Sequence, residues 1–269
     1  MAARLAGCLL LTVGILGVFA MAPSRPAQAQ DAAACPPPDP AWASPSASAS
    51  PSPSASATPT SLPPIQPRLD GPAGVVALTF DAGADRGYAE DILDTLLAEQ
   101  VPATFGMTGT WAQANADLVA RMAAEGHQVI NHTYDHRSFT GLSDRLGGLS
   151  AERRRQELLD ADAIIAPLIG HTTCPWFRVP YGDDDARVDQ DVAELGYTQK
   201  VGWTIDTLGW RGARVQDIVD RSLRLAAPNA IYVMHVGVQS RDGPALPLVI
   251  DGLREQGYGF ATVAALPSD

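Results

Sequence analysis

The 269-residue sequence is short of basic residues, and this shortage excludes a class of partner. Lysine and arginine number 19 against 30 acidic residues, so the formal net charge is -11. Nucleic acid and anionic membrane surfaces attract basic proteins, so neither is expected as a partner. A neutral or cationic substrate fits this charge better, although acidity also serves simply to keep an exported protein in solution.

Cysteine is scarce as well, with three residues at positions 8, 35 and 174. Their spacing is not that of a zinc knuckle, which excludes a cysteine-based structural metal site. Cys8 lies in the N-terminal apolar segment. Cys35 and Cys174 remain as an even pair, and a disulfide between them is an open alternative if the chain is exported.

The only long apolar stretch lies within residues 1–29, which have the features of a signal peptide. Arg4 precedes an apolar segment over 5–21, and Ala27-Gln28-Ala29 fits the cleavage pattern A-x-A. The segment is short for a membrane span, so we expect export with cleavage and keep a retained anchor as the alternative. Membrane contact is expected only through this segment, before cleavage.

Residues 30–70 have almost no large apolar side chains and are dominated by proline, serine, alanine and threonine. Such a segment cannot bury enough surface to fold, so we predict a disordered spacer. Residues 71–269 are long enough for one well-buried domain, which we expect to be catalytic and monomeric.

Strand-like and helix-like segments alternate through this domain. Strands are predicted at 75–80, 102–107, 127–131, 176–179, 197–205, 230–234 and 258–263, and helices at 85–100, 118–126, 150–169, 185–195, 215–226 and 246–256. The alternation predicts an α/β fold with parallel strands joined by right-handed crossovers. About seven such units favour a distorted, incomplete, seven-stranded (β/α) barrel.

Polar residues directly follow five of the predicted strands: Asp81, His132, Arg178, Asp206 and His235. In a parallel barrel the carboxyl ends of the strands form one rim, so these side chains are expected to converge there. A second histidine follows His132 by four positions, at His136. On a helical turn that spacing aims both imidazoles at one point, as a divalent metal requires.

These stretches together resemble the motifs of the polysaccharide deacetylases, the NodB-homology family or carbohydrate esterase family 4. The family patterns are T-F-D-D-G, H-[ST]-x-x-H, R-x-P-Y, D-x-x-D-W and L-x-H. The corresponding stretches here are Thr79-Phe80-Asp81-Ala82-Gly83, His132-Thr133-Tyr134-Asp135-His136, Arg178-Val179-Pro180-Tyr181, Asp206-Thr207-Leu208-Gly209-Trp210 and Val233-Met234-His235. The resemblance covers residues 74–266.

The resemblance implies a hydrolase of carbon–nitrogen, non-peptide bonds that removes N-acetyl groups from N-acetylglucosamine-containing polysaccharide. Asp81 would be the general base toward the attacking water, and Arg178 would orient it. His235 would protonate the departing amine. His132 and His136 would hold a divalent metal, usually zinc. Such chemistry needs all three functions because an amide is a poor electrophile with a poor leaving group.

Two further aromatic residues, Tyr181 and Trp210, are candidates for stacking on a sugar ring, although both could be plain packing aromatics. A backbone N–H near Tyr181 is a candidate for holding the oxyanion. Asp206 is assigned to the catalytic group with Asp81, Arg178 and His235.

The sequence departs from the family pattern twice. Ala82 stands where the pattern has the acid that completes the metal ligands, so the third ligand is either Asp85 or water, and Asp85 is alternatively a helix cap. Gly209 stands where the pattern has the acid that neighbours the acid histidine. Either Asp206 takes that pairing or no residue does.

The predicted signal and spacer favour cell-wall peptidoglycan as the substrate and a secreted, wall-associated location. Chitin oligosaccharides are the alternative substrate. A wall-binding relative weakened in catalysis, and an amidase for small cyclic substrates, are the alternative functions.

Overall fold

The computed structural model describes residues 74–266. The predicted signal peptide, the predicted spacer and Cys35 lie outside the described residues. Cys174 is disulfide-bonded. No helix among the described residues is both long and apolar enough to cross a membrane.

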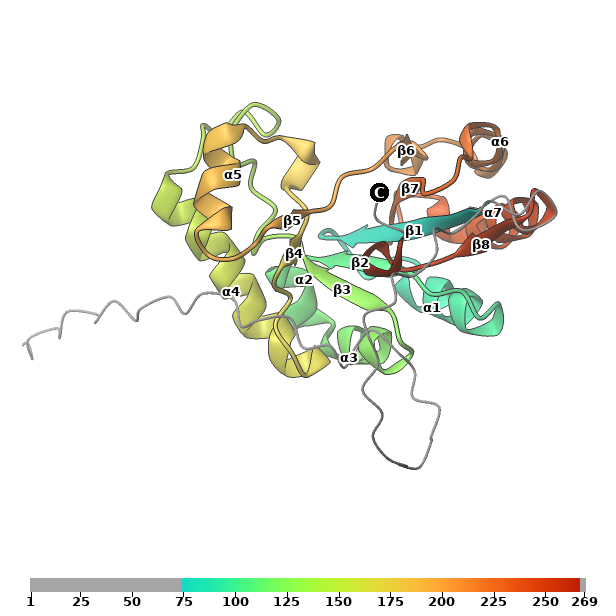
Figure 1. Ribbon diagram of the computed structural model, residues 1–269, viewed down its shortest axis with the longest axis horizontal. Helices are drawn as coiled ribbons and strands as arrows, with labels where there is room; N and C mark the ends of the chain where they lie inside the picture. Colours follow the sequence, from blue (N-terminus) through green and yellow to red (C-terminus); the bar gives the residue numbers. More distant parts are fainter. Residues whose placement is uncertain (1–73, 267–269) are drawn as a thin grey trace, which may run out of the picture. The chain divides into compact units, whose positions relative to one another are not determined.

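The first strand, β1, is the centre of the fold. It spans Gly74–Ala82, and its side chains from Val76 onward are all buried. An uninterrupted apolar run forms such a strand when neighbouring strands and helices cover both of its faces. It pairs in parallel with β2 (Thr104–Met107), β7 (Ile231–His235) and β8 (Tyr258–Phe260). Figure 1 shows β1 in the middle of the sheet.

All described strand pairs are parallel, in the order β5-β4-β3-β2-β1-β7-β6, with β8 paired to β1 off this path. The remaining strands are β3 (Gln128–Asn131), β4 (Trp176–Phe177), β5 (Gln199–Lys200) and β6 (Ile205–Asp206). The predicted α/β fold is confirmed: seven parallel strands lie along one path as a distorted half-barrel, and its two ends are not paired with each other within residues 74–266.

The described α-helices alternate with these strands along the chain. They are α1 (Ala89–Ala98), α2 (Gly109–Ala114), α3 (Ala116–Ala124), α4 (Ala151–Ile169), α5 (Ala186–Ala193), α6 (Val215–Leu225) and α7 (Asp242–Glu255). Helix α2 was not predicted, since it is short and its only aromatic anchor is Trp111. Helix α4 begins at the predicted serine, because the Ser150 side chain accepts the Arg153 N–H. Helix α5 is capped by Asp185, whose carboxylate accepts two N–H groups.

The predicted strand over 197–205 is wrong. It divides into β5 and β6, which lie at opposite ends of the sheet path, and residues 201–204 join those ends (Figure 1). The carbonyls of Val201 and Gly202 accept the Nε and Nη2 of Arg178, each at 3.1 Å, and so do not continue the ladder. The four-residue connection therefore links the two ends of the sheet path.

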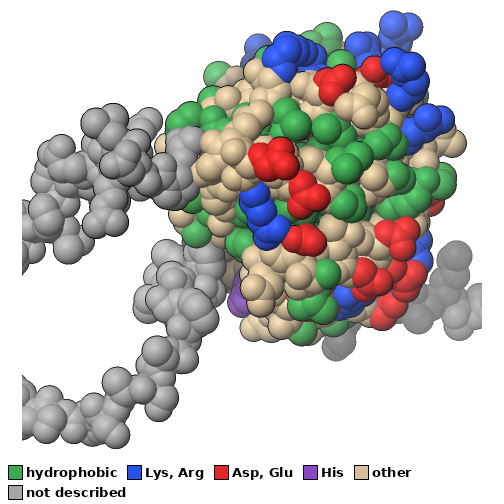
Figure 2. Space-filling view, turned by 90° about the vertical axis from the view of Figure 1, so that its right-hand side faces the viewer, with side chains coloured by type: hydrophobic (Ala, Val, Ile, Leu, Met, Phe, Trp, Pro, Cys, Tyr) green, Lys and Arg blue, Asp and Glu red, His purple; other side chains and the backbone are tan. Residues whose placement is uncertain are grey.

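Helices α1, α6 and α7 lie on the right of Figure 1, the side that faces the viewer in Figure 2. Acidic, basic and apolar side chains are interspersed there, with lysine and arginine in separate groups rather than a continuous basic surface (Figure 2).

A buried histidine before β3 predicts a pH-dependent stability. The Nδ1 of His127 accepts the N–H of Ala103 at 3.2 Å, and burial lowers the pKa of His127 from 6.5 to about 4. Between these values the unfolded chain binds more protons than the folded one. The stability from this group is therefore complete above pH 6.5 and is lost as the pH falls toward 4, by up to about 1.4 kcal/mol per pH unit.

Urea unfolding at pH 7.5 and pH 5 measures this loss. His127→Asn is the matched control, because the amide oxygen retains an acceptor for Ala103 but does not titrate. We expect a smaller loss of stability at pH 5 in the variant than in the wild type. An equal loss in both proteins would contradict the assignment to His127.

Candidate active site

The carboxyl ends of the strands bring the predicted residues together. Asp81 at the end of β1 is in register with Gly106 of β2 on one side and with His235 of β7 on the other. His132 directly follows β3, and Arg178 directly follows β4. These four side chains therefore come from β1, β7, β3 and β4 and lie at one end of the sheet.

The centre of the site is a buried ion pair. Arg178 is fully buried and its Nη1 lies 2.8 Å from Oδ1 of Asp81, which is 8% exposed. Burial by itself raises the pKa of Asp81, but the charges of Arg178, His132 and His235 and the hydrogen bond from Arg178 outweigh it, so the pKa lies below its ordinary value. Asp81 is thus ionised at neutral pH, which is the form a general base requires.

Gly106 makes room for this carboxylate. A Cβ built at Gly106 would lie 2.4 Å from Oδ1 of Asp81, closer than any side chain permits. The sequence pattern did not single out this glycine, because its role depends on the neighbouring strand. The only signal was a glycine inside a strand, which often marks a close approach of another group.

The two histidines that follow β3 are close together and neutral. The Nδ1 of His132 lies 2.9 Å from the Arg178 carbonyl and donates to it, so its Nε2 carries the lone pair and lies 3.6 Å from Oδ2 of Asp81. The rings of His132 and His136 are 4.8 Å apart between centroids. Burial lowers the pKa of both imidazoles, that of His136 to about 3.

The predicted helical turn at residues 132–136 is wrong. The segment is a loop in which Thr133 and His136 have φ values of 67° and 64°. A buried carboxylate of α4 fixes this loop, since Oε2 of Glu157 accepts the N–H groups of Tyr134 and Asp135 at 3.0 and 3.1 Å. Glu157 has no exposed surface and was not predicted from the sequence.

Backbone strain is concentrated in the motifs. Four non-glycine residues in them have positive φ: Thr133, His136, Tyr181 and Leu208. Such conformations cost about 1–3 kcal/mol each and persist where the surrounding structure imposes them, often at functional sites.

Three aromatic side chains lie in the motifs or beside them. The ring of Tyr181 packs edge-on against His136 with centroids 4.6 Å apart, and half of the tyrosine is exposed. Trp203, in the connection between β5 and β6, lies against the Arg178 guanidinium at 5.7 Å and is 36% exposed. Trp210 is also half exposed. All three rings are thus partly exposed, and Trp203 was not predicted.

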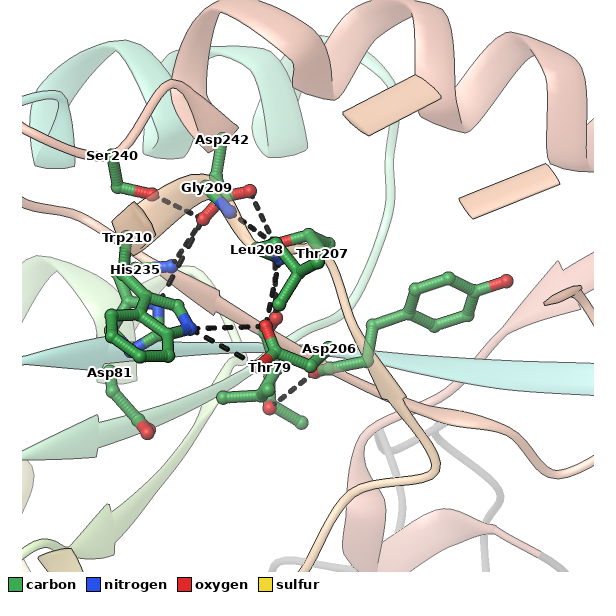
Figure 3. Close-up of polar contacts among 12 residues, drawn as sticks. Thr79, Asp81, Asp206, Thr207, Leu208, Gly209, Trp210, His235, Ser240 and Asp242 are labelled. Atoms are coloured by element: carbon green, nitrogen blue, oxygen red, sulfur yellow. Dashed lines mark hydrogen bonds and ion pairs between the residues drawn. The ribbon is translucent and has the colours of Figure 1, made fainter. Parts of the chain in front are cut away.

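No described contact joins the carboxylate of Asp206 to Asp81, Arg178 or His235. Its carboxylate accepts the N–H of Leu208 at 2.8 Å and the Nε1 of Trp210 at 3.2 Å (Figure 3). The carboxylate within ion-pair distance of His235 is that of Asp242, which the sequence analysis missed. Of the two alternatives for Asp206, pairing with His235 therefore finds no support among the described contacts.

The two histidines after β3 are the candidate ligands for a metal ion. Within residues 74–266, no group of three or more histidine, cysteine, aspartate or glutamate side chains is arranged to hold one. His132 and His136 provide two neutral imidazoles, and position 82 is a buried alanine. The chemistry of these two donors fits part of a divalent-metal site.

Asp85 is held away from both roles suggested by its place in the sequence. Its Oδ1 accepts the N–H of Val238 at 2.9 Å, in the loop after β7. It does not cap α1, whose N-cap is Tyr88 without a side-chain bond. The helix-cap interpretation is therefore wrong. Asp85 also belongs to no metal-binding group among the described side chains.

Comparison with known proteins agrees with the motifs. The polysaccharide deacetylase family model matches residues 68–200. The chain is 31% identical over 195 residues to a peptidoglycan-N-acetylglucosamine deacetylase of Bacillus cereus, covering 71% of this chain and 87% of the relative. It is 32% identical over 173 residues to a chitooligosaccharide deacetylase of Sinorhizobium fredii, covering 64% of this chain and 76% of the relative.

A solved structure extends the comparison to the fold. A CE4 family pseudoenzyme from Bacillus anthracis superimposes with a TM-score of 0.64 and 26% identity, covering 71% of this chain and 64% of that one. The motifs, the half-barrel and these relatives agree with the resemblance noted in the sequence. The chain belongs to the polysaccharide deacetylase family, carbohydrate esterase family 4, whose members are hydrolases that generally depend on a metal.

Proposed function

We propose that this protein is a secreted hydrolase that removes N-acetyl groups from N-acetylglucosamine-containing polysaccharide, with peptidoglycan as its substrate. The observation that carries the proposal is the buried Asp81, ionised beside Arg178 and in register with His235. The B. cereus relative is a peptidoglycan-N-acetylglucosamine deacetylase. Together with the predicted signal and spacer, this similarity supports peptidoglycan as the substrate and an extracellular, wall-associated location.

The chain's own residues would divide the reaction as follows. Asp81 takes a proton from the attacking water as its oxygen bonds to the acetamide carbon. Arg178 keeps the carboxylate in place through the 2.8 Å ion pair. His235 gives a proton to the amine nitrogen as the C–N bond breaks, which releases acetate and a free amine. A positioned base and acid each contribute about 10²–10⁴-fold in rate.

We propose that His132 and His136 hold a divalent cation, and that this cation is zinc. Imidazole nitrogens suit zinc, and both rings are neutral as a ligand must be. When bound, the cation would polarise the acetamide carbonyl and promote ionisation of the attacking water. With only two protein ligands we expect the affinity to be lower than that of a three-ligand site.

Acetate release tests this function. Purified peptidoglycan and chitin oligosaccharides are incubated with the protein, with and without a chelator. We expect acetate from peptidoglycan, lost on chelation and restored by zinc. If acetate is released from chitin oligosaccharides alone, peptidoglycan is wrong as the substrate and chitin oligosaccharides take its place. If neither substrate releases acetate, the proposed function is refuted.

A wall-binding relative without catalysis is the second candidate function. It is favoured by Ala82, which removes a ligand, and by the similarity to the B. anthracis pseudoenzyme. Sedimentation with insoluble peptidoglycan in the absence of acetate release would support this candidate instead.

A further inference from the structure

A buried carboxylate outside the motifs lies beside His235. Asp242 is the first residue of α7 and has no exposed surface. Its oxygens accept the Thr207 hydroxyl at 2.7 Å, the Ser240 hydroxyl at 2.5 Å and the backbone N–H of His235 at 2.9 Å (Figure 3). Three donors from two loops and β7 therefore fix the carboxylate in one orientation.

The imidazole of His235 has one buried edge and one open edge. Its Nδ1 is buried and has no hydrogen-bond partner among the described residues, whereas the side chain as a whole is 31% exposed. Oδ2 of Asp242 lies 4.0 Å from this nitrogen. A bare Nδ1 would set its lone pair against the carboxylate, so Asp242 favours a proton on Nδ1. At 4.0 Å the two atoms are too far apart for a hydrogen bond, so the carboxylate acts on the ring through its charge.

The backbone at Gly209 gives independent evidence for this role. A Cβ built there would lie 2.6 Å from both carboxylate oxygens of Asp242 and 2.5 Å from the Ser240 hydroxyl. The Asp242 carboxylate therefore occupies the space into which any side chain at position 209 would project. Gly209 is the position at which the fourth motif departs from the family pattern, because it lacks the acid found there. The carboxylate of Asp242, which the sequence analysis missed, lies next to that position.

We propose that Asp242 is the positioning residue of His235, supplying from α7 the carboxylate that Gly209 lacks. It holds a proton on Nδ1 and turns Nε2 toward the open side, where the departing amine of the proposed function would lie. The other charged or titratable groups that act on His235 are Asp81 from β1 and the two histidines after β3. Among residues 74–266, Asp242 is the acid within ion-pair distance of the buried Nδ1. The inference rests on the proposed function for the role of Nε2, but not for the state of Nδ1.

The first test reads the tautomer directly, without substrate. Nitrogen-15 NMR of the full chain, with the His235 signals assigned by their loss in His235→Gln, should show Nδ1 protonated in the neutral ring. Asp242→Asn should shift the ring toward a mixture of tautomers. A wild-type ring protonated on Nε2 would overturn the proposal even if every variant failed to fold.

The second test moves the carboxylate between elements. Asp242→Asn should lower kcat about 10–100-fold with little change in KM, the range seen when an outer-shell partner is removed. Gly209→Asp alone should be destabilised, because two carboxylates would compete for one space. Gly209→Asp combined with Asp242→Ala should restore the Nδ1–H tautomer and much of kcat. Asp217→Asn, which removes an exposed acid from the first turn of α6, is the matched control for a helix terminus.

A purely structural role for Asp242 gives a different pattern. In that case Asp242→Asn would keep both the Nδ1–H tautomer and the wild-type kcat, or the folded double variant would stay as impaired as Asp242→Asn; either result overturns the proposal. Absence of acetate release from the wild type would refute the proposed function instead, while the tautomer would still decide the role of Asp242.

Discussion

Asp81→Asn is expected to lower the turnover of acetylated polysaccharide about 10²–10⁴-fold, the usual contribution of a general base. The amide oxygen can still accept the hydrogen bond that Arg178 now donates to Oδ1 at 2.8 Å. The variant thus retains the shape of the site but loses the proton acceptor. Acetate release under saturating substrate, together with zinc content, measures the effect.

Two controls separate chemistry from folding in this experiment. Asp217→Asn removes an exposed acid on α6 that pairs with Arg214, and this variant should keep full activity. Thermal melting shows whether Asp81→Asn is folded, because the variant leaves the Arg178 charge buried without its counter-charge, which is destabilising. A folded Asp81→Asn protein with wild-type turnover would exclude Asp81 as the base.

Ala82→Asp is expected to tighten zinc binding by at least about tenfold, since it restores the third protein ligand that catalytic zinc sites usually have. Position 82 is buried in the apolar core at the end of β1. Gly83 follows it, and a Cβ there would lie 3.7 Å from the His136 ring, so the strand ends close to the histidines. Without zinc the new carboxylate is a buried charge, and the variant should melt below the wild type.

Added zinc should therefore raise the melting temperature of Ala82→Asp more than that of the wild type, because a ligand that binds only the folded state stabilises it by an amount that grows with the logarithm of its affinity. Ala82→Asn has the same shape without the charge and should show a smaller zinc effect. A variant that is destabilised and not recovered by zinc would mean that the side chain at 82 faces the apolar core and cannot reach the histidines.

The sequence by itself determined most of the strands and the positions of the polar residues that follow them. The run from Val76 to Phe80 is apolar except for Thr79, and such a run is buried in only a few ways. Because parallel strands share one carboxyl end, the polar residues after them were expected to meet, and Asp81, Arg178 and His235 do so. These features follow from period and local order, which sequence carries directly.

Local pattern failed where a long-range partner takes the backbone's hydrogen bonds. Residues 197–205 look like one strand, but Arg178 binds the carbonyls at 201 and 202 and divides the segment. The spacing of His132 and His136 fits a helical turn, but Glu157 of α4 accepts the N–H groups between them and imposes a loop. In both cases a buried charged side chain, distant in sequence, outweighs the local preference.

Only the tertiary structure decided which carboxylate adjoins His235. Gly209 looks in the sequence like a loss, and Asp242 lies four residues before the predicted helix over 246–256 and outside every motif. The two are close because the loop after β6 and the start of α7 both pack against the end of β7, where Asp242 binds both Thr207 and the His235 backbone. The spacing of residues along the chain does not predict that contact, because the contact depends on how two crossover connections pack against one strand.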